Sequence, residues 1–199
     1  MQVFFDIFDY FYRGGPLLLP IVLVSLIMWV LILLQLQTVW AVNRSDIALD
    51  EALAAVRNQT LIGDFSGAPL ARIVMRFITS RGRFRDDNVT LLNTLVERES
   101  SRLGCYINYI YALASIAPLL GLLGTVQGMI VTFDAIAVYG TGNPGALANG
   151  IAEALITTQS GLFVSIPGLF MAAFLRRRVL RIAQRLNEFR AGVMKELEG

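Results

Sequence analysis

Long apolar runs alternate along the chain with arginine-rich segments, and this pattern predicts helices that cross a membrane. Leu17–Leu36 carries no charge, and about 20 apolar residues suffice to cross a hydrocarbon core of about 30 Å. A second apolar run covers residues 107–139 and is longer than a membrane is thick, so its helix should protrude on the side of Arg98 and Arg102. A third run, Ile151–Leu175, ends at an arginine cluster. The pattern predicts an all-α integral membrane protein with three transmembrane helices.

The segments outside these runs also have helical character. Aromatic residues and a few charges at helical spacing predict an amphipathic helix over residues 1–15. Residues 43–102 mix many arginines with acids and predict a small helical domain, with Ser45 as an N-cap and a helix over residues 68–79. Asp86 or Asp87 is expected to cap a further helix that runs from residue 88 into the second span.

Two arginine clusters, one before the second span and one after the third, predict the orientation, because basic residues concentrate on the cytoplasmic side. The region before the second span and the segment after the third should both be cytoplasmic, which leaves the N-terminus outside. Residues 140–150 lack Lys and Arg, which fits an outer loop, although Asn143-Pro144 could instead begin a helix. The predicted organisation is a periplasmic segment 1–15, a first span 16–40, a cytoplasmic helical domain 41–103, a second span 104–139, a periplasmic loop 140–150, a third span 151–175 and a cytoplasmic helix 176–199.

Composition supports a membrane protein and excludes several kinds of site. Hydrophobic residues make up 55% and charged residues 16%, whereas soluble domains carry about 25% charged residues. The chain has no His and a single Cys, so we expect no metal site, no cofactor, no internal disulfide and no His-dependent enzyme activity. A formal charge of +2 gives no reason to expect nucleic acid as a partner.

Candidate chemistry lies in the second and third spans. Asp134 and Glu153 are the only strongly ionisable residues between Leu103 and Leu175, and a charge within a span marks a candidate functional site. Whether Asp134 or Glu153 titrates is left open, because both should lie near the outer ends of their helices. Small residues at spacings of three and four also form a stripe that predicts close helix packing: Ala114, Pro118, Gly121, Thr125, Gly128 and Thr132.

Three strings carry a resemblance to a known family. APLLGLLGTV at residues 117–126, GIAEALITT at 150–158 and Ile166-Pro167 resemble the ExbB/TolQ family of proton-channel subunits, ExbB most of all. The resemblance implies a three-span subunit of the bacterial inner membrane that forms a homopentameric ring around single-span ExbD/TolR-type partner helices. It further implies that proton flow drives a TonB- or TolA-type protein spanning the periplasm, as in outer-membrane import.

The same resemblance assigns roles to individual residues. It places Thr125 and Thr158 on the pore-lining threonines, Glu153 on the intramembrane glutamate and Pro118 on the proline of the second span, and it predicts a proton pathway along Thr125, Thr158 and Glu153. Two hypotheses concern other positions. Pro118, Gly121, Gly128, Thr132 and Ser165 should form the packing seam, and Arg176, Arg177, Arg178 and Arg181 should bind lipid of the inner leaflet.

Departures from the family pattern leave the branch open. Gln127 stands where Trp is common, and Gln159-Ser160 replaces a small apolar pair. A TolQ-type subunit for envelope integrity is therefore the nearest alternative to TonB-linked import. A membrane scaffold that conducts no ions is the rival outside the family.

Overall fold

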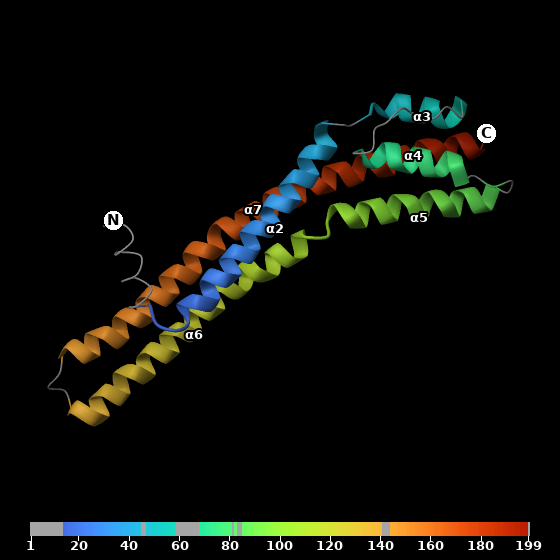
Figure 1. Ribbon diagram of the computed structural model, residues 1–199. Coiled ribbons are helices and arrows are strands. Elements are labelled where there is room, and N and C mark those ends of the chain that lie inside the picture. Colours follow the sequence, from blue (N-terminus) through green and yellow to red (C-terminus); the bar gives the residue numbers. More distant parts are fainter. Residues whose placement is uncertain are drawn as a thin grey trace. The chain divides into compact units, whose positions relative to one another are not determined.

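The computed structural model describes residues 14–44, 47–58, 68–80, 82, 85–140 and 144–198. Within these ranges the chain forms α-helices joined by turns (Figure 1). The helices are α2 Leu18–Arg44, α3 Leu49–Asn58, α4 Pro69–Ser80, α5 Arg85–Leu103, α6 Ile107–Tyr139 and α7 Pro144–Glu198.

Three stretches of helix are long and apolar enough to cross a membrane, namely Leu18–Val42, Asp86–Tyr139 and Leu147–Lys195. The predicted all-helical membrane architecture with three spans is confirmed at this level. The chain divides into two compact units, and α2 and α7 each contribute residues to both.

The first unit comprises residues up to Ile32 and Asn108–Ala172, which include most of α6 and the first half of α7. In it α6 and α7 run antiparallel and side by side (Figure 1). Small residues at spacings of three and four form the buried face of each helix, so the two backbones approach closely. The buried small residues are Ala114, Ala117, Gly121, Gly124, Gly128 and Thr132 on α6, and Gly150, Ala154, Thr157, Gly161, Ser165 and Gly168 on α7.

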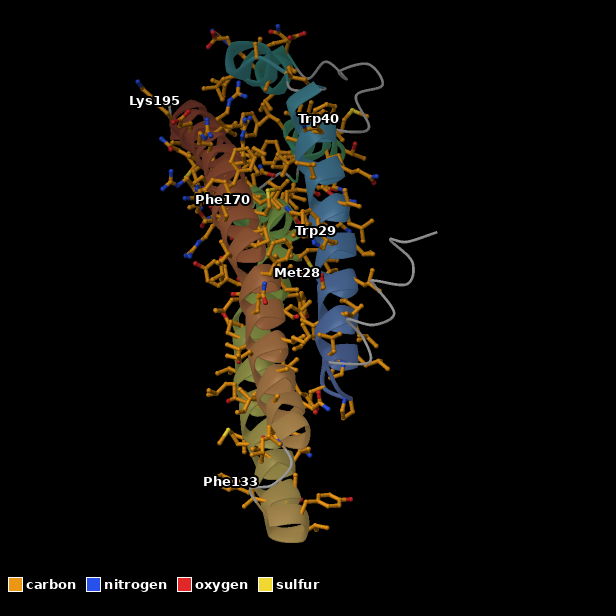
Figure 2. The ribbon with its side chains drawn as sticks, turned by 90° about the vertical axis from the view of Figure 1, so that its left-hand side faces the viewer. Met28, Trp29, Trp40, Phe133, Phe170 and Lys195 are labelled. Carbon is orange, nitrogen blue, oxygen red and sulfur yellow. The ribbon has the colours of Figure 1, made fainter. Side chains whose placement is uncertain are left out.

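The start of α2 packs against this helix pair through Met28, whose side chain is fully buried. A Cβ atom added at Gly168 would collide with the Met28 sulfur and would come within 3.0 Å of Ala114 Cβ. Met28 points toward α7 in Figure 2. The absence of a side chain at Gly168 thus makes room for the longer side chain from α2.

The second unit comprises Leu33–Ile107 and Ala173–Gly199, and it contains α3, α4 and α5 with the ends of α2 and α7. Glu99 is buried and accepts hydrogen bonds at one oxygen from Arg72 Nε (3.2 Å) and Nη2 (2.8 Å). Arg102 lies 3.7 Å from the other oxygen. Gln35 on α2 is buried and donates through Nε2 to the carbonyl oxygen of Leu103 at 2.7 Å. The Arg72–Glu99 pair thus joins α4 to α5, and the bond from Gln35 joins α2 to the last residue of α5.

Several predicted boundaries need correction. The helix expected to run unbroken from residue 88 into the second span is interrupted, because α5 ends at Leu103 and turns connect it to α6 at Ile107. Asp86 and Asp87 lie in the first turn of α5 rather than before it. The helix expected over residues 68–79 is confirmed as α4.

Residues 140–150 are not a loop throughout, because α7 begins at Pro144 as the alternative start had allowed. Proline is favourable there because the first helical residue needs no backbone N–H donor. The expected helix over residues 1–15 falls almost wholly outside the described residues, and the predicted N-cap at residue 45 falls outside them too.

Candidate functional site

The small-residue faces of α6 and α7 meet in a contact that we call the seam. It contains most of the residues predicted to line the pore or to pack the second and third spans together. A Cβ atom added at Gly128 would lie 2.6 Å from the carbonyl oxygen of Gly150 and 2.9 Å from Ala154 Cβ. One added at Gly161 would lie 2.6 Å from the carbonyl oxygen of Ala117. Contacts this short with a backbone cannot be relieved by turning a side chain. The seam therefore requires glycine at these two positions.

Threonine hydroxyls line the same seam but bond in two ways. Thr158 Oγ1 donates across the seam to the carbonyl oxygen of Gly121 at 3.2 Å. Thr125 Oγ1 donates within its own helix to Leu122 O at 2.7 Å, and Thr132 Oγ1 donates to Gly128 O at 2.8 Å. Bonds within one helix are the usual state of a Thr in a membrane span. The bond made by Thr158 therefore joins the two helices, and those made by Thr125 and Thr132 do not.

The two threonines on the predicted proton path lie at neighbouring levels of the seam. Thr158 contacts Gly121, and Thr125 lies one helical turn from Gly121, about 6 Å along α6. Both side chains are half-buried. Their hydroxyls keep lone pairs that can accept a hydrogen bond while they donate to a carbonyl. The pair can therefore present acceptor oxygens to water or to an acidic group.

Glu153 is separated from Thr158. Five residues along α7 correspond to a rotation of about 140°, so the two side chains leave the helix in different directions. The carboxylate of Glu153 lies against Gly15, in the turn before α2. Asp134 is exposed near the end of α6 and makes no ion pair among the described residues.

The predicted packing residues divide into two groups. Gly121, Gly128, Thr132 and Ser165 are buried, whereas Pro118 is half-buried. The expected stripe missed several residues that make the closest approach: Ala117, Gly124, Gly150, Thr157 and Gly161. Their signal was present in the sequence, because small residues also recur at spacings of three and four at these positions.

The outer surface of the first unit carries large apolar side chains. Trp29 is 43% exposed, Phe133 61% and Phe170 74%, and Figure 2 shows these residues on three different helices. A soluble protein seldom exposes so large an apolar surface. Lipid or other membrane helices are the surroundings that such a surface requires.

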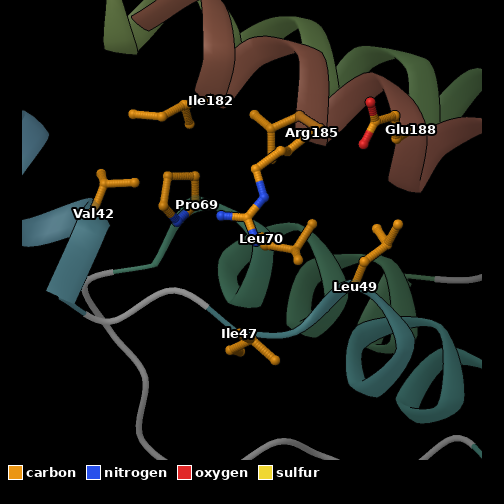
Figure 3. Close-up of a pocket in the computed structure, with 9 residues that line it drawn as sticks. Val42, Ile47, Leu49, Pro69, Leu70, Ile182, Arg185 and Glu188 are labelled. Atoms are coloured by element: carbon orange, nitrogen blue, oxygen red, sulfur yellow. The ribbon is translucent and has the colours of Figure 1, made fainter. Parts of the chain in front are cut away.

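The second unit holds a small pocket that involves none of the predicted channel residues. Figure 3 shows the Arg185 side chain reaching from α7 toward Pro69 and Leu70 of α4. Apart from Arg185 and Glu188 its lining is apolar: Val42, Ile47, Leu49, Pro69, Leu70, Ile182 and Leu186.

The predicted lipid-binding arginines do not share one environment. Arg176, Arg177 and Arg181 are exposed. Arg178 is half-buried, and its guanidinium lies 5.3 Å from the centre of the Phe174 ring, within the range of a cation–π contact. Arg178 therefore contributes to packing inside the second unit, and three arginines are left accessible to an anionic surface.

Within the described ranges no group of three or more His, Cys, Asp or Glu residues could hold a metal ion. The chemistry available at the seam is that of hydroxyls, backbone carbonyls and isolated carboxylates. Three apolar helices and a seam of small and hydroxyl-bearing residues define a polytopic helical membrane protein. The chain belongs to the MotA/TolQ/ExbB proton channel family, whose model matches residues 59–188 and so includes the whole seam.

Individual relatives agree with this membership. ExbB of Xanthomonas campestris, a biopolymer transport protein, is 37% identical over 130 residues, which cover 65% of this chain and 47% of that protein. An ExbB-like protein of Synechocystis is 29% identical over 207 residues, covering 96% and 77%. TolQ of Haemophilus influenzae, a Tol-Pal system protein, is 36% identical over 98 residues, covering 49% and 43%. The matched part spans just under half the length of the Xanthomonas relative.

Proposed function

We propose that this chain is the channel subunit of a proton-driven complex in the bacterial inner membrane. Five copies form a ring that encloses the single-span helices of an ExbD/TolR-type partner. Proton flow through the complex drives a TonB-type protein that reaches across the periplasm and energises outer-membrane import. The N-terminus lies in the periplasm, and the second unit, with the C-terminus, lies in the cytoplasm.

The observation that carries this proposal is the seam itself, in a chain of a proton channel family. Thr125 and Thr158 place hydroxyls at neighbouring levels of two packed helices. The nearest acid along α7, Glu153, leaves the helix in a different direction from Thr158. Such a wall can solvate a proton-carrying carboxylate supplied by another chain, because hydroxyls both donate and accept hydrogen bonds. The acid that carries the proton then belongs to the partner.

The accessible arginines fit the same arrangement. Arg176, Arg177 and Arg181 follow directly after the third apolar run, where the headgroups of anionic inner-leaflet lipid would lie. Each Lys or Arg near such a surface contributes about 1 kcal/mol of attraction. These residues would hold the end of the span at the cytoplasmic face.

A TolQ-type role in envelope integrity is the second candidate, and similarity to the Haemophilus protein favours it. The two roles differ in the periplasmic protein that is driven, not in the seam. Complementation of strains that lack either system separates them, since import of iron complexes and resistance to detergent are distinct readouts.

Proton flux into liposomes that contain the chain and its partner tests the proposed wall. Thr158→Val should reduce the flux at least tenfold, because it removes one of the two hydroxyls proposed to solvate the proton-carrying carboxylate of the partner. Thr157→Val is the matched control, since the Thr157 hydroxyl is buried and donates only within α7, to Glu153 O at 3.1 Å and Ala154 O at 3.0 Å. Equal flux through the Thr158→Val complex and the control would refute the proposed role.

A further inference from the structure

Gly15 and Glu153 meet at the point where the chain enters α2. Gly15 has a φ of 66°, a left-handed conformation that favours glycine. A Cβ atom added there would overlap the carboxylate of Glu153 and would lie within 3.0 Å of its Cγ. The backbone conformation thus favours glycine at this position, and the Glu153 side chain would have to move to admit a Cβ atom.

The turn that contains Gly15 is compact. The N–H of Leu18 donates to the carbonyl oxygen of Gly15 at 3.2 Å, which closes the turn directly before the helix. The Glu153 carboxylate occupies the space where a side chain at residue 15 would begin. It also lies beside the N-terminus of α2, where negative charge is favourable.

A second contact holds the same two helices farther along. Met28 of α2 sits in the space left by Gly168 of α7. Because the contacts Gly15–Glu153 and Met28–Gly168 occur in the same order along both segments, α2 and α7 run in the same direction. From Glu153 to Gly168 α7 rises about 22 Å, and α2 rises about 15 Å from Leu18 to Met28, with the turn that contains Gly15 extending the chain beyond the start of the helix. The two contacts therefore hold α2 against α7 at two separate levels and together fix the position of α2 along α7.

We propose that Glu153 is a positioning residue that seats the first span on the third, and that Gly15 is its receptor. The carboxylate acts by its shape and its acceptor oxygen, not by carrying a proton through the channel. This inference goes beyond the proposed function, because it concerns the position of α2 and holds whether or not the complex conducts protons.

If Glu153 acts through this contact, substitutions at this position should have different effects from those expected for a proton carrier. Glu153→Gln keeps the length of the side chain and one acceptor oxygen, so it should preserve both the melting temperature of the purified complex and its proton flux. Glu153→Ala removes the contact and should lower the melting temperature by several degrees. For a proton carrier, Glu153→Gln would abolish the flux as completely as Glu153→Ala.

Gly15→Ala tests the receptor side, and Gly140→Ala is its matched control. Gly140 has a nearly identical φ of 67°, but a Cβ atom added there meets nothing within 4 Å. Both variants carry the same backbone strain, and only Gly15→Ala adds the collision with Glu153. We expect Gly15→Ala to lower the melting temperature by about 4 °C more than Gly140→Ala does.

The double variant Gly15→Ala, Glu153→Ala completes the test. With the carboxylate gone, the excess effect of Gly15→Ala over Gly140→Ala should disappear when it is measured in the Glu153→Ala background. An excess that persists there would overturn the proposal, as would a Glu153→Gln complex that melts as early as Glu153→Ala. A wild-type complex that passes these tests but conducts no protons would refute the proposed function alone.

Discussion

At the scale of single residues, what matters in the seam is whether an atom bonds to its own helix or to the next one. Thr158 is distinctive because its hydroxyl reaches the backbone of α6, whereas the Thr157 hydroxyl beside it stays within α7. The Thr157 side chain instead fills the space over Gly124, where a Cβ atom would collide with it. Adjacent threonines thus have separate roles, one at the face proposed for the channel and one in packing.

Gly128→Ala gives a prediction in which the sign is informative. In an open helix, replacing Gly by Ala stabilises by about 1 kcal/mol. At Gly128 the new methyl would lie 2.6 Å from the backbone of α7, so we expect a loss of about 1–3 kcal/mol. Thermal unfolding of the detergent-solubilised complex measures it. Gly82→Ala is the control, because a Cβ atom there meets nothing within 4 Å; equal effects would argue against close packing at Gly128.

Part of the seam could be predicted from residue spacing alone. Gly121 and Gly128 recur at heptad spacing, and both are buried. Gly124 was missed because a stripe through Ala117 and Gly124 has the same spacing as one through Pro118 and Thr125. Only the position of α7 decides which of two adjacent stripes is buried, and that depends on contacts distant in sequence.

At the scale of helices, local patterns predicted most elements but not the way in which they end. The spans and α4 follow from apolar runs and helical periodicity, which are properties of the local sequence. At the break between α5 and α6, the side-chain amide of Gln35, 68 residues away in sequence, donates to the carbonyl oxygen of Leu103, the last residue of α5. Gly104, directly after the last residue of α5, was a signal of this break in the sequence, because glycine often follows the end of a helix, whereas the bond from the buried Gln35 joins residues that are distant in sequence.

The Arg72–Glu99 pair holds α4 to α5 and can be tested at the same scale. Arg72→Leu should destabilise the second unit by about 1–3 kcal/mol, because it leaves the Glu99 carboxylate buried with fewer donors. Chemical denaturation followed by circular dichroism measures the change.

Restoration of stability is the second half of that test. The double variant Arg72→Leu, Glu99→Leu should recover much of the loss, since replacing both members of a buried pair by apolar residues is often neutral. A double variant that is no more stable than Arg72→Leu would show that the cost does not arise from the buried charge.

At the scale of the whole molecule, the sequence predicts that the chain spans a membrane, and the structure shows which faces of its helices must be covered by lipid or by other helices. In the first unit α6 and α7 each bury a face of small residues and expose a face of large apolar ones, whereas α2 also buries larger apolar side chains such as Met28. The exposed face must meet lipid or neighbouring helices, and the number of copies is not encoded in residue spacing. Ring size and partner therefore depend on surfaces that only the assembled complex brings together.

The proposed function requires that several copies of the chain enclose an ExbD/TolR-type partner. Native mass spectrometry of the detergent-extracted complex, expressed alone and together with such a partner, tests it most directly. We predict a mass of five chains, which increases by the mass of bound partner chains on co-expression. A monomer or dimer whose mass does not change when the partner is present would contradict the claim and support the scaffold instead.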